Sequence, residues 1–495
     1  MKKVLLIGAG KSSGYLIDYL LSYAVAENYI FTVADLNMEA ALLKTKGLPN
    51  SKAIVLDINN AEDRLQHIQE ADIVISMLPA FMHFPVAQDC VNLKKHLVTA
   101  SYVSPEIMGL NDIAVKHDVL LLNEIGLDPG IDHMSAMKVI HEIQQQGGQL
   151  TSFKSFCGGL VAPESNNNPW GYKFSWNPRN VILAGQSTAQ FMLDGKYKYL
   201  PYQRLFASSE VIELDGYGKF DAYANRDSLS YRKIYGIENI STMIRGTLRQ
   251  HLYCEAWHVF VMLGLTDDSI QIDLPENYTY ADFIAAFLPG ADADLIVRLC
   301  EFTGRSVNDK IIQMILWTGI LGNEVIGLKK ASPAMILQKL LEKKWLLEPQ
   351  DKDMIVMQHI FEFRNNKGLQ KAISSTLVVI GENNEKTAMA KTVGLPLAMA
   401  VRRLIKGEIL LRGVQIPVTS EIYEPILNSW FSSWQEKAKK ENAIVFMAHS
   451  IGDVKNHESS YIAGVCSPKR RVALELIDEF VEDFKKMHLF GNMIF

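Results

Sequence analysis

Two glycines near the start of the chain have a spacing that suits the binding of a phosphate group. Gly8 and Gly10 follow directly on the apolar run at residues 4–7, and a helical pattern begins shortly after them. Glycines here permit a tight turn and a close backbone approach to a pyrophosphate, and the free N–H groups of the helix N-terminus attract the anion. The third glycine of the usual G-x-G-x-x-G pattern is displaced, because position 13 is Ser13 and Gly14 follows it. The alternative is an ordinary glycine-rich turn.

A carboxylate, Asp35, follows the second apolar run at residues 31–34. In a dinucleotide-binding fold, an acid at this position accepts hydrogen bonds from the ribose hydroxyls and repels a 2′-phosphate. No arginine follows it closely, since the next residues are Leu36 and Asn37. The sequence therefore predicts NAD as the cofactor, with NADP less favoured. Asp57, after a third apolar run, either reaches the adenine or caps the next helix.

The nicotinamide side of the cofactor is expected beside Met77, Leu78 and Pro79, which follow the fourth apolar run and supply apolar packing. The complete set of predicted cofactor contacts is Gly8, Gly10, Lys11, Ser12, Ser13, Asp35, Asp57, Ile58, Leu78, Ala100 and Leu127.

Polar side chains also follow the fifth and sixth apolar runs. Ser101 and Tyr102 come after residues 97–99, and Asp128 lies in a turn sequence after residues 119–122. Ligands of doubly wound sheets bind beyond the carboxyl ends of the strands, so these residues are candidates for substrate contacts and acid–base work. The alternatives are that Asp128 only forms the turn and that Tyr102 only fills packing space.

The elements that position these residues are predicted from short apolar runs that alternate with helical patterns. Such runs are typical of strands buried on both faces, and their alternation with helices indicates a parallel sheet. The predicted fold class is α/β, with a Rossmann-type doubly wound parallel sheet. The expected helix spans residues 15–24, and the expected strands are residues 4–7, 31–34, 54–56, 73–75, 97–99 and 119–122.

Eight longer motifs occur in order between residue 1 and about residue 430. They lie at residues 126–133, 156–160, 172–176, 225–228, 245–249, 352–357, 387–396 and 421–427. Together they resemble the glutamate-forming saccharopine dehydrogenase family. The resemblance implies NAD-dependent oxidation of the secondary amine of saccharopine, followed by imine hydrolysis to L-glutamate and 2-aminoadipate 6-semialdehyde. It places the enzyme in lysine metabolism and suits lysine degradation, but it leaves open whether the physiological direction is lysine breakdown or synthesis.

The resemblance also implies which residues bind saccharopine: Ser101, Tyr102, Asp128, Arg226, Thr247, Leu248 and Arg249. Saccharopine carries three carboxylates, and arginine pairs with a carboxylate through two parallel N–H bonds. Arg226 and Arg249 are therefore expected to clamp carboxylates, with surface salt bridges as the alternative.

The catalytic candidates that the resemblance implies are Asp128, Tyr102 and Cys157. Asp128 is expected to hold the substrate ammonium, and Tyr102 or Cys157 to move protons. The general base stays unassigned among them, and Cys157 is alternatively a small buried filler. His133 is expected to be a structural partner at a helix start.

The predicted organisation has a second, mixed α/β substrate domain and a small helical lobe. The cofactor domain spans residues 1–130 and is completed by about 387–430, which the resemblance folds back onto it. The substrate domain spans 131–280 and 350–386, the helical lobe 281–349, and a C-terminal extension of unknown role 431–495. Within the extension, residues 434–440 and 472–484 have helical patterns, and 467–471 form a basic turn.

Composition narrows the class of protein. The 495 residues carry a net charge of −5, and 48% are hydrophobic, so nothing calls for a nucleic-acid or membrane partner. The five cysteines show no CxxC pair, which favours a reducing compartment and argues against a metal site. We expect a cytoplasmic, free-standing enzyme whose partner is a small-molecule substrate, with a homodimer as its assembly.

The chain departs from the family pattern at one flank of the pocket and from the fungal form at the cofactor site. Gln250 stands where the family often has tyrosine. The fungal form uses arginine after the second strand together with NADP, whereas this chain has Asp35.

Two other functions are alternatives to saccharopine oxidation. One is a carboxynorspermidine-type dehydrogenase of polyamine synthesis, which would need fewer carboxylate clamps. The other is a non-catalytic NAD-binding protein.

Overall fold

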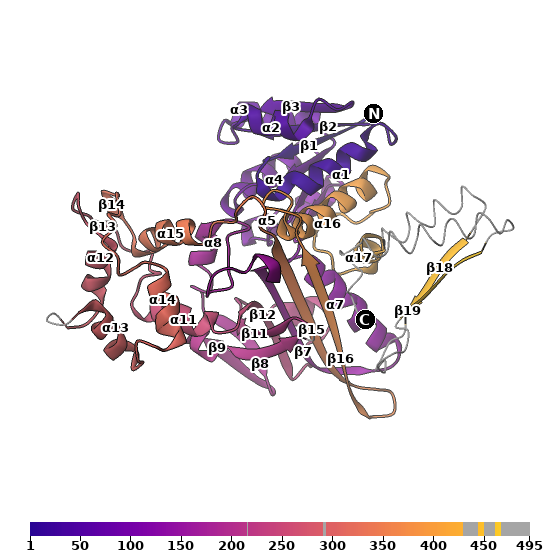
Figure 1. Cartoon of the computed structure of the whole chain (residues 1–495). Coiled ribbons are helices and arrows are strands. Elements are labelled where there is room, and N and C mark those ends of the chain that lie inside the picture. Colours follow the sequence, from indigo (N-terminus) through magenta and orange to yellow (C-terminus); the bar gives the residue numbers. More distant parts are fainter. Residues whose placement is uncertain (215, 291–293, 429–443, 450–460, 467–495) are drawn as a thin grey trace. The chain divides into compact units, whose positions relative to one another are not determined.

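The computed structural model describes residues 1–214, 216–290, 294–428, 444–449 and 461–466 (Figure 1). Its contacts divide the chain into two units. The first comprises Met1–Leu150, Glu362–Gly381 and Glu385–Phe495, and the second comprises Thr151–Phe361 and Glu382–Asn384.

The first unit is built on a seven-stranded sheet with the order β17-β6-β5-β4-β1-β2-β3. All its neighbouring strands are parallel. The order reverses at β1 and β4, as in other doubly wound folds. The strands are β1 (Lys2–Ile7), β2 (Tyr29–Asp35), β3 (Ser51–Val55), β4 (Ile73–Ser76), β5 (His96–Thr99), β6 (Leu120–Leu122) and β17 (Gly413–Gln415).

Helices cover both faces of this sheet because successive strand residues point to opposite sides. Leu5 and Ile7 belong to a core with residues of α3, α4, α5 and α6. On the other side, α1 packs against α16, a helix from far along the chain (Figure 1). The helices are α1 (Gly14–Ala24), α2 (Met38–Thr45), α3 (Ala61–Glu70), α4 (His83–Asn92), α5 (Pro105–Met108), α6 (Asn111–Lys116), α7 (Ile131–Gln145), α16 (Ala388–Ile405) and α17 (Ser420–Leu427).

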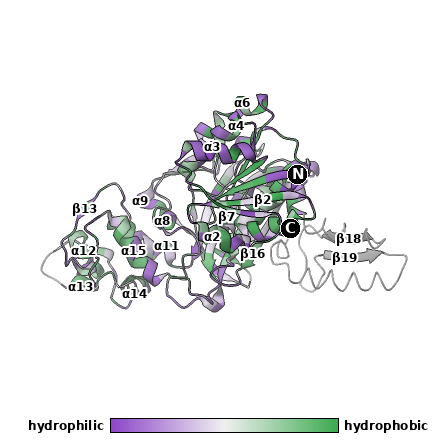
Figure 2. Ribbon diagram, turned by 90° about the horizontal axis from the view of Figure 1, so that it is seen from above, coloured by the Kyte–Doolittle hydropathy of each residue, from purple (hydrophilic) through white to green (hydrophobic). Residues whose placement is uncertain are grey.

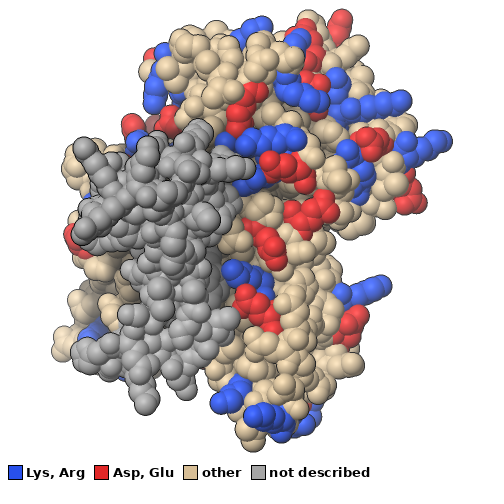
Figure 3. Space-filling model, turned by 90° about the vertical axis from the view of Figure 1, so that its right-hand side faces the viewer, with Lys and Arg blue, Asp and Glu red and all other residues tan. Residues whose placement is uncertain are grey.

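The outward faces of the helices carry mostly polar side chains, as α3 shows. α3 is largely purple in Figure 2, since its sequence AEDRLQHIQE is mostly polar and only Ile68 is buried. On the face drawn in Figure 3, basic and acidic side chains are interspersed, in keeping with the small net charge of −5.

The second large sheet is mixed. Its strand order is β10-β11-β12-β7-β15-β16, and β8 and β9 extend it from β12. β12 and β7 are parallel, whereas β10, β11 and β12 are antiparallel neighbours. The strands are β7 (Gln149–Val161), β8 (Ala189–Leu193), β9 (Lys196–Leu200), β10 (Glu210–Leu214), β11 (Gly218–Ala224), β12 (Thr242–Gln250), β15 (Asp353–Arg364) and β16 (Gln370–Ile380).

Helices of the second unit enclose an aromatic core. Trp170 stacks on Phe260, and Tyr253 stacks on Trp257. The longer helices are α11 (Tyr253–Met262), α12 (Tyr280–Phe287), α13 (Leu295–Thr303), α14 (Lys310–Trp317) and α15 (Pro333–Lys344), and shorter ones are α8 (Pro178–Ile182), α9 (Tyr202–Leu205) and α10 (Tyr231–Ile234).

The predicted α/β class and the six predicted strands of the first unit are confirmed. The seventh strand, β17, was not predicted. Near the C-terminus, β18 (Ile444–His449) and β19 (Tyr461–Cys466) pair in antiparallel fashion. The helical patterns at 434–440 and 472–484 and the basic turn at 467–471 lie outside the described residues. Within the described part, no helix is both long and apolar enough to cross a membrane.

Candidate active site

The glycine turn after β1 leaves open backbone where a phosphate group would lie. Gly8 has φ +104°, and a Cβ there would come within 3.0 Å of the Met77 carbonyl oxygen. At Gly10 an added Cβ would meet nothing within 4 Å. A short 3-10 helix (Lys11–Ser13) then leads into α1. The close approach at Gly8, the open space at Gly10 and the helix start together fit a pyrophosphate.

Asp35, at the end of β2, is engaged by the backbone on both oxygens. Oδ2 accepts the Ala9 N–H at 2.7 Å, and Oδ1 accepts the Asn37 N–H at 2.9 Å. A cation lies at the same turn, because Lys44 Nζ of α2 donates to Ser13 Oγ at 2.8 Å and to the Gly10 carbonyl. Burial lowers the pKa of Lys44, and the nearby Asp35 carboxylate opposes that shift. Asp35 is therefore not the only charged side chain at this glycine turn, because Lys44 also contacts it.

The other predicted cofactor contacts lie along the ends of the same strands. Asp57 is exposed, and its Oδ1 accepts the Asn59 N–H at 2.9 Å. The cap of α3 is Asn60, so the alternative that Asp57 caps this helix is wrong. Among the remaining predicted contacts, Lys11 is exposed, Ser12, Leu78 and Ala100 are half-buried, and Ser13, Ile58 and Leu127 are buried.

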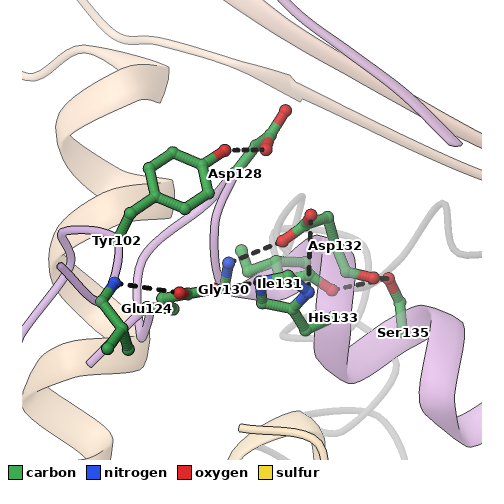
Figure 4. A network of polar contacts seen from close by, with 9 residues as sticks. Tyr102, Glu124, Asp128, Gly130, Ile131, Asp132, His133 and Ser135 are labelled. Carbon is green, nitrogen blue, oxygen red and sulfur yellow. Dashed lines mark hydrogen bonds and ion pairs between the residues drawn. The ribbon is translucent and has the colours of Figure 1, made fainter. Parts of the chain in front are cut away.

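Tyr102 and Asp128, two of the predicted catalytic residues, contact each other. The Tyr102 hydroxyl donates to Asp128 Oδ1 at 3.2 Å, and both residues are half-buried (Figure 4). Tyr102 comes from the segment after β5, and Asp128 from the segment after β6. The carboxyl ends of these parallel strands therefore bring together an acid and a phenol, groups that can exchange a proton with a ligand.

A buried cluster of polar side chains, which the sequence did not predict, connects these two segments. Glu124 Oε1 accepts the Val103 N–H at 3.0 Å, and Oε2 lies 2.9 Å from His133 Nε2. His133 Nδ1 lies 3.8 Å from an oxygen of Asp132, whose other oxygen accepts the Gly130 N–H at 2.6 Å (Figure 4). The cluster ties the residue after Tyr102 to the turn that carries Asp128. Glu124 has φ 56°, and this acid two residues after the end of β6 was the available sequence signal.

We expect Glu124→Ala to destabilise the first unit by about 1–3 kcal/mol, because it removes the carboxylate that pairs with the buried His133 Nε2 and accepts the Val103 N–H. Amide hydrogen exchange of α7 measures this unit separately from the other. Glu70→Ala removes an exposed carboxylate of the same unit and is the control. Equal protection of α7 in the two variants would show that the Glu124–His133 contact contributes little.

In the second unit, Cys157 and Thr247 lie side by side on neighbouring strands. Thr247 of β12 is in register with Cys157 of β7 on one side and with Tyr223 of β11 on the other. Side chains at matched register share one face of a sheet. Leu248 points to the opposite face and is fully buried, and its carbonyl accepts a hydrogen bond from the Arg249 guanidinium at 2.9 Å.

The two predicted clamp arginines differ in their surroundings. Arg249 is 4% exposed, and its guanidinium lies 5.3–5.9 Å from the ring centres of Tyr172, Tyr223 and Tyr253. Burial alone would lower the pKa of Arg249, but the tyrosine oxygens raise it overall, so the side chain stays charged. Within the described residues, its Nε has no hydrogen-bond partner and no carboxylate pairs with it.

Arg226, by contrast, is exposed and lies in the loop after β11, with φ 46°. Its backbone is held, because the Arg226 carbonyl accepts the Gln190 N–H at 2.8 Å, and Ser228 Oγ accepts the Arg245 N–H at 2.9 Å. The structure thus forms two local groups of predicted residues. Ser101, Tyr102 and Asp128 lie in the first unit, and Cys157, Arg226, Thr247, Leu248 and Arg249 in the second.

A parallel sheet of this order, with a glycine turn after its first strand, defines a dinucleotide-binding protein of the Rossmann class. Comparison with known families then gives the particular member of that class. Residues 4–122 match the saccharopine dehydrogenase NADP binding domain, and residues 126–431 match the saccharopine dehydrogenase C-terminal domain. The chain belongs to the saccharopine dehydrogenase family.

Individual relatives agree over most of the chain. It is 34% identical over 435 residues to the saccharopine dehydrogenase [NADP(+), L-glutamate-forming] of Pyricularia oryzae, covering 86% of this chain and 96% of that protein. The apo saccharopine dehydrogenase (L-Glu forming) structure from Saccharomyces cerevisiae matches with a TM-score of 0.78 and 33% identity. That match covers 88% of this chain and 98% of the other.

These comparisons contradict the predicted use of NAD. The relative is named for NADP(+), and the matching family domain is an NADP binding domain. The prediction counted the Asp35 carboxylate as the only charge beside the ribose. In the structure both Asp35 oxygens already accept backbone N–H groups, and Lys44 brings a positive charge to the same turn from the next helix.

A shorter likeness concerns a different kind of protein. The chain is 45% identical over 65 residues to the molybdopterin synthase catalytic subunit of Helicobacter pylori, which is 13% of this chain and 45% of that protein. Because the match spans less than half of the subunit, it assigns no activity to this chain.

Proposed function

We propose that the chain oxidises the secondary amine of L-saccharopine with NADP and hydrolyses the product imine to L-glutamate and 2-aminoadipate 6-semialdehyde, in lysine breakdown. The observation that carries the proposal is 34% identity over 96% of a relative named for this reaction. The contact between Tyr102 and Asp128 supports it. The proposal includes a cytoplasmic location and a homodimeric assembly. Sedimentation of the purified chain tests the assembly.

The cofactor would be held by the turn between β1 and α1. The backbone at Gly8 and Gly10 would face the pyrophosphate, and Asp35 and Lys44 would lie toward the adenosine ribose. When bound, NADP supplies the redox chemistry by accepting a hydride from the amine-bearing carbon. Lys44 would offset the added charge of the 2′-phosphate, which Asp35 alone would repel.

Acid–base work falls to the residues of the two local groups. The substrate nitrogen must lose a proton before a hydride can leave the neighbouring carbon, and water must then add to the resulting iminium. Asp128 would hold the ammonium as a carboxylate beside a cation. Tyr102, hydrogen-bonded to Asp128, or Cys157, beside Thr247, would carry protons to and from the nitrogen, and the general base stays unassigned between them.

The carboxylates of saccharopine need donors and positive charge. Arg226, which is exposed, would pair with a carboxylate of the ligand, while Arg249 would act through its fixed positive charge and Thr247 through its hydroxyl. Ser101 would add a hydroxyl from the first unit.

Turnover of saccharopine by the purified 495-residue chain tests the proposal, with NADPH absorbance as the signal. We expect activity with NADP that exceeds activity with NAD. Turnover of carboxynorspermidine but not saccharopine would replace this function by the polyamine reaction. Binding of NADP without turnover of either substrate would identify a non-catalytic nucleotide-binding protein.

Lys44→Ala is expected to raise the KM for NADP by about 10-fold or more, since hydrogen bonds to charged groups contribute about 1.5–3 kcal/mol. The KM for NAD should change far less, because NAD lacks the 2′-phosphate. Lys52→Ala, at an exposed lysine of β3, is the matched control. An equal rise for both cofactors would mean that Lys44 only supports the glycine turn.

A further inference from the structure

A chain of three polar side chains links β4, α4 and the segment after β5. The Ser76 hydroxyl lies 2.8 Å from His83 Nδ1, and the Ser101 hydroxyl lies 2.6 Å from His83 Nε2. Ser76 and His83 are 1% and 2% exposed. Ser101 is half-buried and is the only member of the three that the sequence assigned to substrate binding. His83 thus reaches the predicted site only through Ser101.

The His83 ring is neutral at ordinary pH. Burial lowers its pKa to about 4. Both ring nitrogens face hydroxyl groups, and within the described residues no carboxylate pairs with the ring. A neutral imidazole has one N–H donor and one acceptor nitrogen, so Ser76 and Ser101 must play opposite roles.

Ser76 decides which nitrogen carries the hydrogen. In the described part of the chain, its hydroxyl has no hydrogen-bond partner besides His83. If Nδ1 donated to Ser76, the buried Ser76 O–H would be left without an acceptor, which is unfavourable. The satisfied arrangement has Ser76 donating to Nδ1, so the hydrogen lies on Nε2 and is donated to Ser101 Oγ.

This arrangement makes Ser101 a donor toward a ligand. Its oxygen receives the His83 N–H, and no other acceptor within the described residues takes its own O–H. A hydroxyl held in this way suits an anion such as a carboxylate oxygen and suits an ammonium group poorly.

We propose that His83 is a positioning residue that fixes the Ser101 hydroxyl as a hydrogen-bond donor to a carboxylate of the substrate. The inference rests on the proposed function for the identity of that substrate. It adds a residue that favours carboxylate-bearing substrates without contacting them.

Two nearly isosteric variants separate this role from simple packing. In His83→Gln the amide can replace Nε2 and still donate to Ser101, whereas in His83→Asn the amide replaces Nδ1 and reaches only Ser76. We expect His83→Asn to raise the KM for saccharopine about 10-fold more than His83→Gln does, as for a lost bond to a charged group. The kcat should be similar in both. Equal KM values in the two variants would overturn the proposal.

The effect must also pass through Ser101. In a Ser101→Ala background, His83→Asn and His83→Gln are expected to give the same KM, and a persistent difference would overturn the proposal. The ring itself can be observed by nitrogen NMR of histidine-labelled protein, with the signal of His83 identified by its loss in His83→Gln. A hydrogen on Nδ1 would overturn the inference even if saccharopine is the substrate. If wild type fails to turn over saccharopine, it is the proposed function that falls, and the NMR result still tests the tautomer.

Discussion

Asp128→Ala is expected to lower kcat/KM for saccharopine by about 10²–10⁴-fold, the range for loss of an acid–base group. Asp128 combines three features that point to such a role. It follows the strand next to the one that positions Tyr102, it accepts a hydrogen bond from that phenol at 3.2 Å, and it is half-buried. A carboxylate in this setting can hold an ammonium and pass its proton to a neighbour.

The measurement is steady-state NADPH formation over a range of pH. Asp128→Asn keeps the shape of the side chain but not its charge, and should lose nearly as much activity as Asp128→Ala. Asp112→Ala, at an exposed acid of the same unit, is the control for general effects of charge. An Asp128→Asn enzyme with wild-type kcat/KM would show that Asp128 serves only as a turn residue.

Much of the first unit was predictable because its strands are buried on both faces. Continuous apolar runs such as residues 73–75 leave few alternatives once helical patterns alternate with them. The sequence did not predict β17 (Gly413–Gln415), because its three residues contain no apolar run. Its pairing with β6 makes it a strand. Such a strand is set by tertiary contacts, which no local pattern records.

The site was predictable where strand ends place residues and unpredictable where packing does. Tyr102 and Asp128 follow neighbouring parallel strands, so their contact follows from the topology. Glu124, by contrast, contacts His133 from a residue with φ 56°, and nothing in the local sequence gives that angle. His83 is a lone histidine at a helix start, and only the fold brings it between Ser76 and Ser101.

The wrong prediction of NAD has a similar origin. It treated Asp35 as an isolated charge, although electrostatic preference depends on every charge near the ribose. Lys44 is nine positions further along the chain and on the next helix, yet its ammonium contacts the same glycine turn as Asp35 does. A cofactor motif based only on the acid after the second strand does not take Lys44 into account.

Arginines of the same apparent type also separate by environment. Arg249 lies among three tyrosines in the core, so its removal should affect stability as well as binding. Arg226 is exposed, so its loss should leave folding almost unchanged. This difference makes Arg226 the cleaner probe of how the enzyme recognises carboxylates.

Arg226→Ala is accordingly expected to raise the KM for saccharopine roughly 10- to 150-fold with little change in kcat, since a hydrogen bond to a charged group is worth about 1.5–3 kcal/mol. Arg226→Lys keeps the charge but not the planar guanidinium, so its KM should lie between the KM of wild type and that of Arg226→Ala. Arg204→Ala, at another exposed arginine of the second unit, is the control. An unchanged KM in Arg226→Ala, with thermal unfolding as in wild type, would remove Arg226 from the clamp.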